Sequence, residues 1–212
     1  MLEAITGPFV STVETRTDPP GADLFPEERA VIAGAAAARR TEYTTTRRCA
    51  HRAMARLGLP PAPVPSGPRG EPLWPTGVVG SLTHCRGYRG AALARADRVT
   101  AIGIDAEPNG PLRGDVLRVI SLPAERAWIR RLSESAPGVA WDRLLFSAKE
   151  SVFKAWYPLT RRELRFGEAL VTVEPETGAF HARLLVPGPR VHGRELTGFS
   201  GRWLAEDGLL LT

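Results

Sequence analysis

Three carboxylates, Asp105, Glu107 and Glu150, are the side chains whose types and spacing best suit a chemical role. Asp105 and Glu107 lie two residues apart at the end of an apolar segment, 99–105, that we expect to be a strand. Because side chains two apart on a strand point to the same face, both carboxylates can reach one ion. Hard divalent cations such as magnesium prefer oxygen ligands and usually combine a few carboxylates with water and substrate phosphates. Asp105 and Glu107 alone could simply belong to a solvated turn. Together with Glu150, the acids favour phosphoryl-transfer chemistry.

Lys149 and Lys154 are the only two lysines of the chain, and they flank Glu150 at one and four residues' distance. Apolar periodicity predicts a helix over 141–156 and places these three residues opposite its apolar face. A surface ion pair between Glu150 and Lys154 is the simplest interpretation, because residues four apart on a helix are neighbours. Every other basic residue is arginine, however, and an ammonium is not interchangeable with a guanidinium. The lysines therefore favour a specific role beside the carboxylate.

Two further groups of residues could bind phosphate oxygens. Thr83 and His84 belong to a glycine-flanked turn between two expected strands, although a lone histidine is more often structural. Arg39 and Arg47 are eight residues apart and would share one side of a continuous helix. A basic solvated face is the simpler interpretation of these arginines alone.

The elements that must position these residues alternate between helix and strand in two similar-sized parts, 1–100 and 101–212. Hydrophobic periodicity predicts helices at 42–57 and 141–156. The alanine-rich segment 26–40 should also be helical, and 112–133 should be helical or mixed. Strands are expected at 77–81, 89–94 and 99–105, followed by an antiparallel meander of 169–173, 182–186 and 198–211. Residues 1–25 should be irregular, and the proline-rich segment 60–77 should be an extended loop. The fold class expected is α/β (α+β).

Length, charge and cysteine content narrow the classes of protein that the chain can represent. Its 212 residues suffice for one large domain or two small lobes. A net charge of +5 favours polyanionic partners, whether nucleic acid, phosphorylated cofactors or an acidic protein. The two cysteines, Cys49 and Cys85, indicate neither a disulfide framework nor a zinc ribbon. Without a signal pattern or an apolar run of about 20 residues, we expect a cytoplasmic protein with no membrane contact.

In their order along the chain, these segments resemble the 4′-phosphopantetheinyl transferases of the Sfp/EntD-like class, particularly the actinobacterial type. The most diagnostic segments are Gly103–Pro108 and Phe146–Trp156, which contain the three carboxylates. Weaker matches add up to a resemblance over most of the chain: Arg39–Tyr43, Gly70–Pro72 and Gly80–Cys85. Arg69 stands where related sequences often have a lysine.

The resemblance implies two similar, pseudo-symmetric α/β halves with the active site between them. The N-terminal half, 1–100, would bind the phosphates of coenzyme A, and the C-terminal half, 101–212, would bind magnesium. It implies transfer of 4′-phosphopantetheine from coenzyme A to a serine of an acyl or peptidyl carrier protein, with release of adenosine 3′,5′-bisphosphate. Such enzymes serve fatty acid, polyketide and nonribosomal peptide synthesis, including siderophores. They are usually monomers.

The resemblance also assigns roles to single residues. Asp105, Glu107 and Glu150 would hold Mg²⁺, or Mn²⁺, on the coenzyme A diphosphate. Glu150, or a metal-bound water, would take the proton from the carrier serine as it attacks the β-phosphorus. Lys154 would neutralise charge on the departing phosphate, and Lys149 would contact a phosphate or serve structurally. The remaining coenzyme A contacts would come from Arg39, Arg47, Arg69, Thr83 and His84.

An acidic carrier protein is the macromolecular partner that the resemblance implies. It would dock on the segment 110–133, with apolar contacts from Leu117, Val119 and Ile120. Two other hypotheses compete. A metal-dependent nuclease usually places Glu-x-Lys on a strand, whereas Lys149 and Glu150 follow the reverse order on a helix. An arginine-rich nucleic-acid-binding protein leaves the carboxylates unexplained. We therefore expect no nucleic-acid partner.

Overall fold

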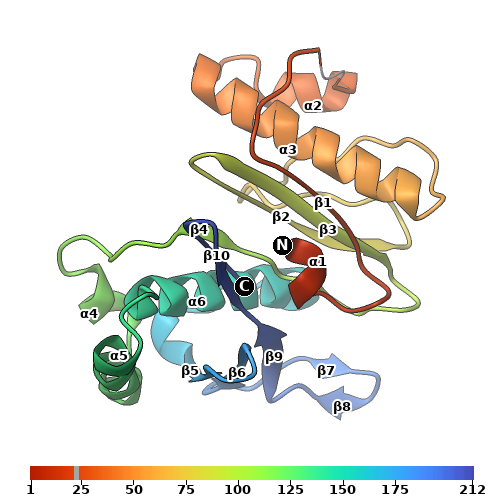
Figure 1. The fold of residues 1–212 in the computed structure, drawn as a ribbon. Coiled ribbons are helices and arrows are strands. Elements are labelled where there is room, and N and C mark those ends of the chain that lie inside the picture. The colour runs from red at the N-terminus through yellow and green to blue at the C-terminus, as the bar shows by residue number, and fades with distance from the viewer. Residues whose placement is uncertain (22–23) are drawn as a thin grey trace. The chain divides into compact units, whose positions relative to one another are not determined.

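The computed structural model describes residues 1–21 and 24–212, which divide into two compact units. One unit comprises residues 2–104, and the other comprises residues 105–212 with Met1. Ala22 and Asp23, part of the N-terminal region expected to be irregular, lie outside the described residues. Helices accompany antiparallel sheets in each unit (Figure 1), so the fold is α+β. Pseudo-symmetry of the two halves, and the domain boundaries given above, stay predictions.

The N-terminal unit is built on a three-stranded sheet covered by a long helix (Figure 1). The strand order is β1-β3-β2, with β1 at Ser11–Thr15, β2 at Val78–Cys85 and β3 at Tyr88–Arg95. Helix α3, Ala37–Arg56, packs against β3 and β1 through fully buried Ala50 and Ala53. Small side chains on the contact face let the helix approach Ala91 and Leu93 of β3 closely.

The first part of the N-terminal unit differs from the sequence-based expectation. Residues 1–25 contain a short helix, α1 at Leu2–Ile5, and strand β1, both of which the sequence prediction missed. The single helix expected at 26–40 is interrupted. Helix α2 covers only Pro26–Val31, and α3 starts at Ala37. Gly34 lies in the break, and a glycine there weakens the helix by about 1 kcal/mol relative to alanine. The loop expected at 60–77 is confirmed, since it contains only one isolated bridge, Ser66 to Pro72.

The strand expected at 99–105 is wrong, because regular pairing begins only at its last residue. Strand β4, Ala106–Pro108, pairs with β11, Leu209–Leu211, which also pairs with β10, Leu204–Glu206. The backbones of Asp105 and Thr212 extend this ladder by exchanging two hydrogen bonds of 2.9 and 3.0 Å. Asp105 and Glu107 therefore still lie two apart on an extended segment, as expected.

The helix expected at 141–156 is confirmed as α6, Trp141–Thr160, and it forms the centre of the C-terminal unit. The apolar face that the sequence predicts is buried, with every member at most 7% exposed: Trp141, Leu144, Leu145, Ala148, Val152 and Ala155. This face packs against helix α5, Pro123–Ser135, and a sheet of β5, Ala169–Glu174, β6, Ala179–Leu184, and β9, Gly198–Arg202 (Figure 1).

Shorter elements complete the C-terminal unit. Helix α4, Val116–Ile120, packs against the 3₁₀ helix η1, Phe166–Glu168. Strands β7, Arg190–Val191, and β8, Arg194–Glu195, form a small hairpin. The last strand expected, 198–211, is divided into β9, β10 and β11, with a turn at Asp207 and Gly208.

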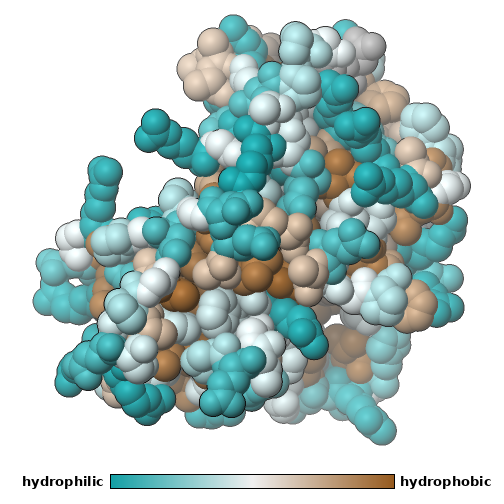
Figure 2. Space-filling view, in the orientation of Figure 1, coloured by the Kyte–Doolittle hydropathy of each residue, from teal (hydrophilic) through white to brown (hydrophobic). Residues whose placement is uncertain are grey.

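The face of the molecule shown in Figure 2 is largely polar, as the charge content implies. Hydrophilic side chains cover much of the face shown in Figure 2, and smaller hydrophobic patches lie between them. Among the described residues, no helix combines the length and the apolar character that crossing a bilayer would take.

Buried Glu28 predicts that the stability of the N-terminal unit is sensitive to acid. The carboxylate of this α2 residue is fully buried and accepts hydrogen bonds from the backbone of Phe25 and Val64, and it pairs with His51 at 2.8 Å. Burial raises the pKa of Glu28, but these hydrogen bonds outweigh it and leave the pKa below 4.5. A pKa that is lower in the folded state stabilises the fold above the unfolded pKa, and the effect is lost as the pH falls through the folded value.

Glu28→Gln should therefore lower the free energy of unfolding by about 1–3 kcal/mol at pH 7. The difference between the two proteins should narrow as the pH falls below about 4.5, because wild type then also loses the charge. Urea unfolding at a series of pH values measures this difference. A difference that stays constant from neutral to acid pH would contradict the role of the charge.

Candidate functional site

The three acids of the expected metal site all lie in the C-terminal unit, on two elements that pack together. Asp105 and Glu107 lie on the extended segment that includes β4, and Glu150 lies on α6. Asp105 is buried, and the other two are half-buried. Burial raises the pKa of Glu150, and repulsion from Asp105 and Glu107 raises it further. The positive charge of Lys154 lowers this pKa but does not cancel the rise. The three carboxylates therefore repel one another, as carboxylates gathered for a cation do.

Lys154 lies beside the first of these carboxylates. Its Nζ atom donates a hydrogen bond to Oδ1 of Asp105 at 2.7 Å, and the lysine side chain is 28% exposed. The sequence-based interpretation as a Glu150–Lys154 surface pair omits this contact, because Asp105 is far from α6 in sequence. Lys154 thus supplies positive charge directly at the acid cluster.

Arg143 is a member of the site that the sequence prediction missed. Its Nη1 atom donates to Oε2 of Glu107 at 2.9 Å, while Nε and Nη2 donate to the carbonyls of Gly110 and Pro111 at 3.1 and 3.0 Å. Burial and Asp105 raise the pKa of Glu107, and Arg143 opposes this rise. Arg143 precedes Glu150 by two helical turns, so both lie on the same helix face. This spacing is the feature of the sequence that could have indicated Arg143.

The donor set suits a hard divalent cation, although the site is not assembled in advance. Among residues 1–21 and 24–212, no three His, Cys, Asp or Glu side chains are grouped closely enough to hold a metal ion. Lys154 and Arg143 instead neutralise Asp105 and Glu107. Magnesium often uses only one or two carboxylates and completes its octahedron with water and phosphate oxygens. The oxygen donors are of the type that magnesium binds, and the metal site itself stays a prediction.

A cavity of about 360 Å³ adjoins Glu150. Its walls include the apolar side chains of Phe153, Leu164 and Phe166, together with Lys149. A half-apolar hollow beside a carboxylate can hold an uncharged organic chain whose reactive end meets the acid.

Lys149, expected to contact a phosphate or to serve structurally, makes three hydrogen bonds inside the C-terminal unit. Its Nζ atom lies 2.8 Å from the Ile120 carbonyl, 2.8 Å from Oε2 of Glu125 and 2.6 Å from the Phe166 carbonyl. An ammonium has three protons to donate, so these acceptors can use all of them. The contacts support the structural role, and a phosphate contact stays a prediction.

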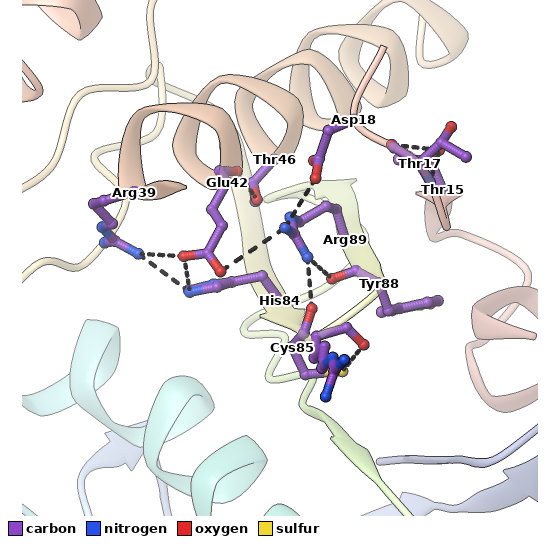
Figure 3. A network of polar contacts seen from close by, with 11 residues as sticks. Thr15, Thr17, Asp18, Arg39, Glu42, Thr46, His84, Cys85, Tyr88 and Arg89 are labelled. Carbon is purple, nitrogen blue, oxygen red and sulfur yellow. Dashed lines mark hydrogen bonds and ion pairs between the residues drawn. The ribbon is translucent and has the colours of Figure 1, made fainter. Parts of the chain in front are cut away.

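A cluster of charged side chains lies in the N-terminal unit and joins two of the residues expected to bind coenzyme A phosphates. Figure 3 shows Arg39 of α3 and His84 of β2 pointing toward each other, with an Nη1–Nε2 distance of 3.1 Å. Glu42 lies 3.6 Å from His84 and 3.9 Å from Arg39, and it also lies 3.8 Å from Arg89. Arg39 and His84 are exposed, so an anion can reach both. The sequence prediction missed Glu42 and Arg89.

Thr83 and His84 lie on strand β2, and the turn expected around them is shorter than predicted. The β2–β3 hairpin turns at Arg86 and Gly87, where Gly87 has a positive φ of 74° that favours glycine. Adjacent residues on a strand point to opposite faces, so Thr83 is buried while His84 is exposed. His84 belongs to the cluster of Figure 3.

Arg47 and Arg69 are both associated with the loop 60–77. Arg47 is buried, donates to the Val64 carbonyl at 2.5 Å and to Oγ of Ser66 at 2.9 Å, and stacks 4.0 Å from the ring centre of Tyr43. Arg69 lies on the exposed part of the same loop. Arg47 thus holds the loop that carries Arg69, and the phosphate contacts expected of both stay predictions.

Comparison with known proteins gives matches over the whole chain. A family model described as the 4′-phosphopantetheinyl transferase N-terminal domain matches residues 27–94, and one described as the 4′-phosphopantetheinyl transferase superfamily matches residues 101–198. The 4′-phosphopantetheinyl transferase Svp of Streptomyces mobaraensis is 56% identical over 215 residues, which cover 100% of this chain and 87% of Svp.

Two other relatives are similar over more than nine-tenths of their own lengths. The 4′-phosphopantetheinyl transferase PptT of Mycobacterium tuberculosis is 51% identical over 100% of this chain and 94% of its own length. The 4′-phosphopantetheinyl transferase Npt of Nocardia iowensis is 46% identical over 100% of this chain and 98% of its own length.

Proposed function

The chain belongs to the 4′-phosphopantetheinyl transferase superfamily and transfers 4′-phosphopantetheine to carrier proteins, and we propose that coenzyme A is the donor and magnesium the metal. Adenosine 3′,5′-bisphosphate is the product that leaves. The observation that supports this proposal is the group of mutually repelling carboxylates Asp105, Glu107 and Glu150 with Lys154 beside them. The matches give no support to the nuclease and nucleic-acid-binding hypotheses.

Asp105, Glu107 and Glu150 are the residues that would hold the metal. Bound magnesium would withdraw charge from the diphosphate and fix its oxygens for attack. Arg143 would orient Glu107 through its hydrogen bond to Oε2. This arrangement supports a cation site completed by the diphosphate of coenzyme A.

Glu150 is suited to accept the proton of the carrier serine. It is half-buried on α6 and lines the 360 Å³ cavity, which is where we place the incoming carrier serine. General bases of this kind contribute about 10²–10⁴-fold to rate. The pantetheine arm of coenzyme A, an uncharged chain, would occupy the cavity against Phe153 and Leu164.

The cations have separate tasks in the transfer. Lys154, held at Asp105, would neutralise charge that develops on the departing phosphate. Arg39 and His84 would bind the 3′-phosphate, since arginine donates in pairs to phosphate oxygens. Thr83, Arg47 and Arg69 would complete the binding of coenzyme A from β2 and the loop 60–77.

Helix α4 offers an exposed apolar surface for the carrier. Val119 is 71% exposed and Val116 is 39% exposed, while the exposed Arg118 adds positive charge for an acidic partner. The docking contact expected of Ile120 is wrong, because Ile120 is only 2% exposed and belongs to the core. Leu117 is partly buried against the same core. We therefore assign docking to Val116 and Val119 rather than to Ile120.

Val119→Glu should raise the KM for the carrier about ten-fold, because it replaces an apolar contact with a charge that repels an acidic partner. The KM for coenzyme A should stay unchanged. Steady-state rates with one substrate varied at a time measure both constants. Val31→Glu is the matched control, since Val31 is 45% exposed on α2 of the other unit. An unchanged carrier KM in Val119→Glu would remove α4 from the docking surface.

The proposal is tested by the intact mass of an apo carrier protein incubated with the enzyme, coenzyme A and magnesium, with an EDTA control. A gain of one phosphopantetheine that disappears with EDTA supports the donor and the metal. Carriers of fatty acid, polyketide and nonribosomal peptide synthases, including those for siderophores, are the candidates to compare. A gain that persists in EDTA would contradict the magnesium site.

A further inference from the structure

Lys149 precedes Glu150 on α6 and forms a buried ion pair with Glu125, and we propose that this pair positions the carrier-docking helix α4 and the cavity wall at Phe166 relative to Glu150. The proposal rests on the proposed function, because it concerns how the carrier serine reaches that carboxylate. It makes Lys149 a positioning residue.

The pair is almost completely shielded from solvent. The side chain of Lys149 is 3% exposed and that of Glu125 is 0% exposed, with 2.8 Å between Nζ and Oε2. Glu125 also accepts two backbone hydrogen bonds, from Leu122 at 2.6 Å and from Val171 of β5 at 2.8 Å. Each polar atom of the pair is thereby satisfied, as a stable buried pair requires.

The ammonium of Lys149 joins three segments that are distant in sequence. It binds the carbonyl of Ile120, the last residue of α4, and the carbonyl of Phe166, the first residue of η1. Helix α4 packs against η1, so the two carbonyls belong to neighbouring surfaces. Ile120 follows exposed Val119, and Phe166 lines the cavity beside Glu150. One nitrogen atom therefore fixes the docking surface and the cavity wall to helix α6.

The chemistry of this junction selects lysine. Three acceptors surround a single nitrogen, which matches the three tetrahedral donors of an ammonium. The planar fork of a guanidinium spreads its donors over three atoms and does not fit this arrangement. This accounts for one of the two lysines in a chain whose other basic residues are arginine.

The pair supplies geometry rather than net stability. Two apolar side chains of similar volume often stabilise a protein as well as a buried ion pair does, because they avoid the desolvation of charge. Apolar side chains cannot hold the carbonyls of Ile120 and Phe166 at fixed positions, however. The expected gain from Lys149 and Glu125 is thus the alignment of α4 and η1 with Glu150.

The test uses the double variant Glu125→Met/Lys149→Met, which removes both charges and keeps the volume. We expect it to fold and to bind adenosine 3′,5′-bisphosphate within about two-fold of wild type, because Arg39 and His84 lie in the other unit. Its kcat/KM for an apo carrier should fall about 10- to 100-fold, mainly through the carrier KM. Lys149→Arg should show the same loss although it keeps the charge. If the double variant does not fold, the carrier kinetics of Lys149→Arg test the proposal instead.

Leu144→Ala is the matched control, since Leu144 is fully buried on α6 and its loss loosens the same helix. It should lower the melting temperature without raising the carrier KM. Wild-type carrier kinetics in both pair variants, or an equal rise of KM in Leu144→Ala, would overturn the proposal. Failure of wild type to modify any carrier would instead overturn the proposed function.

Discussion

Glu150→Gln should abolish transfer of phosphopantetheine while the protein stays folded. Glutamine has the shape of glutamate but can neither accept the proton of the carrier serine nor ligate a cation with a charged oxygen. The expected loss of kcat is at least about 10³-fold, the upper part of the range for a general base. Mass spectrometry of the carrier after timed incubation measures the rate.

The stability of this variant separates catalysis from folding. Burial raises the pKa of Glu150, so its ionised form opposes folding at neutral pH. Glu150→Gln should therefore melt at the same temperature as wild type or higher. Glu134→Gln, at an exposed position on α5, is the matched control with unchanged rate. Wild-type turnover in Glu150→Gln would remove Glu150 from the mechanism.

Lys154→Met should reduce kcat about 10²–10³-fold, the range for losing one group that stabilises charge in a transition state. Lys154→Arg should restore only part of this loss. The Nζ atom lies 2.7 Å from Oδ1 of Asp105, and a larger planar guanidinium cannot take that position unchanged. Rates at saturating carrier and coenzyme A isolate kcat from binding.

Exposed Arg130 on α5 provides the control for a lost positive charge. Arg130→Met removes the same charge from the C-terminal unit and should leave kcat unchanged. If Lys154→Met kept the kcat of wild type, the charge of Lys154 would have no part in the transfer.

Helix α6 could be predicted from the sequence because its apolar face repeats over several turns and is buried as that pattern requires. The irregular backbone of residues 99–104 could not, because the apolar run there predicted a strand. The apolar side chain of Ile104 is buried, and its N–H donates to the side-chain Oγ of Ser81 at 3.1 Å rather than to a backbone carbonyl of a strand ladder. Apolar character reports burial, whereas strand pairing depends on which distant segment lies alongside.

The residues of the candidate site could be predicted where their spacing matches the repeat of a single strand or helix. The two-residue spacing of Asp105 and Glu107 survives in the structure, because the ladder with β11 includes both residues. Glu125 and Arg143 were missed, since their partners are 24 and 36 residues away in sequence. Among so many arginines, composition could not single out Arg143 either.

The pairing of β4 with β11 sets the time at which the carboxylate site can form during synthesis. Pro108 pairs with Leu209, and Asp105 pairs with Thr212, so the segment that carries two of the acids acquires its partner strand only when residues 209–212 have left the ribosome. The N-terminal unit closes its own sheet well before that point. A nascent chain can therefore fold its arginine cluster first, and the acid cluster takes shape only after residues 209–212 have been synthesised.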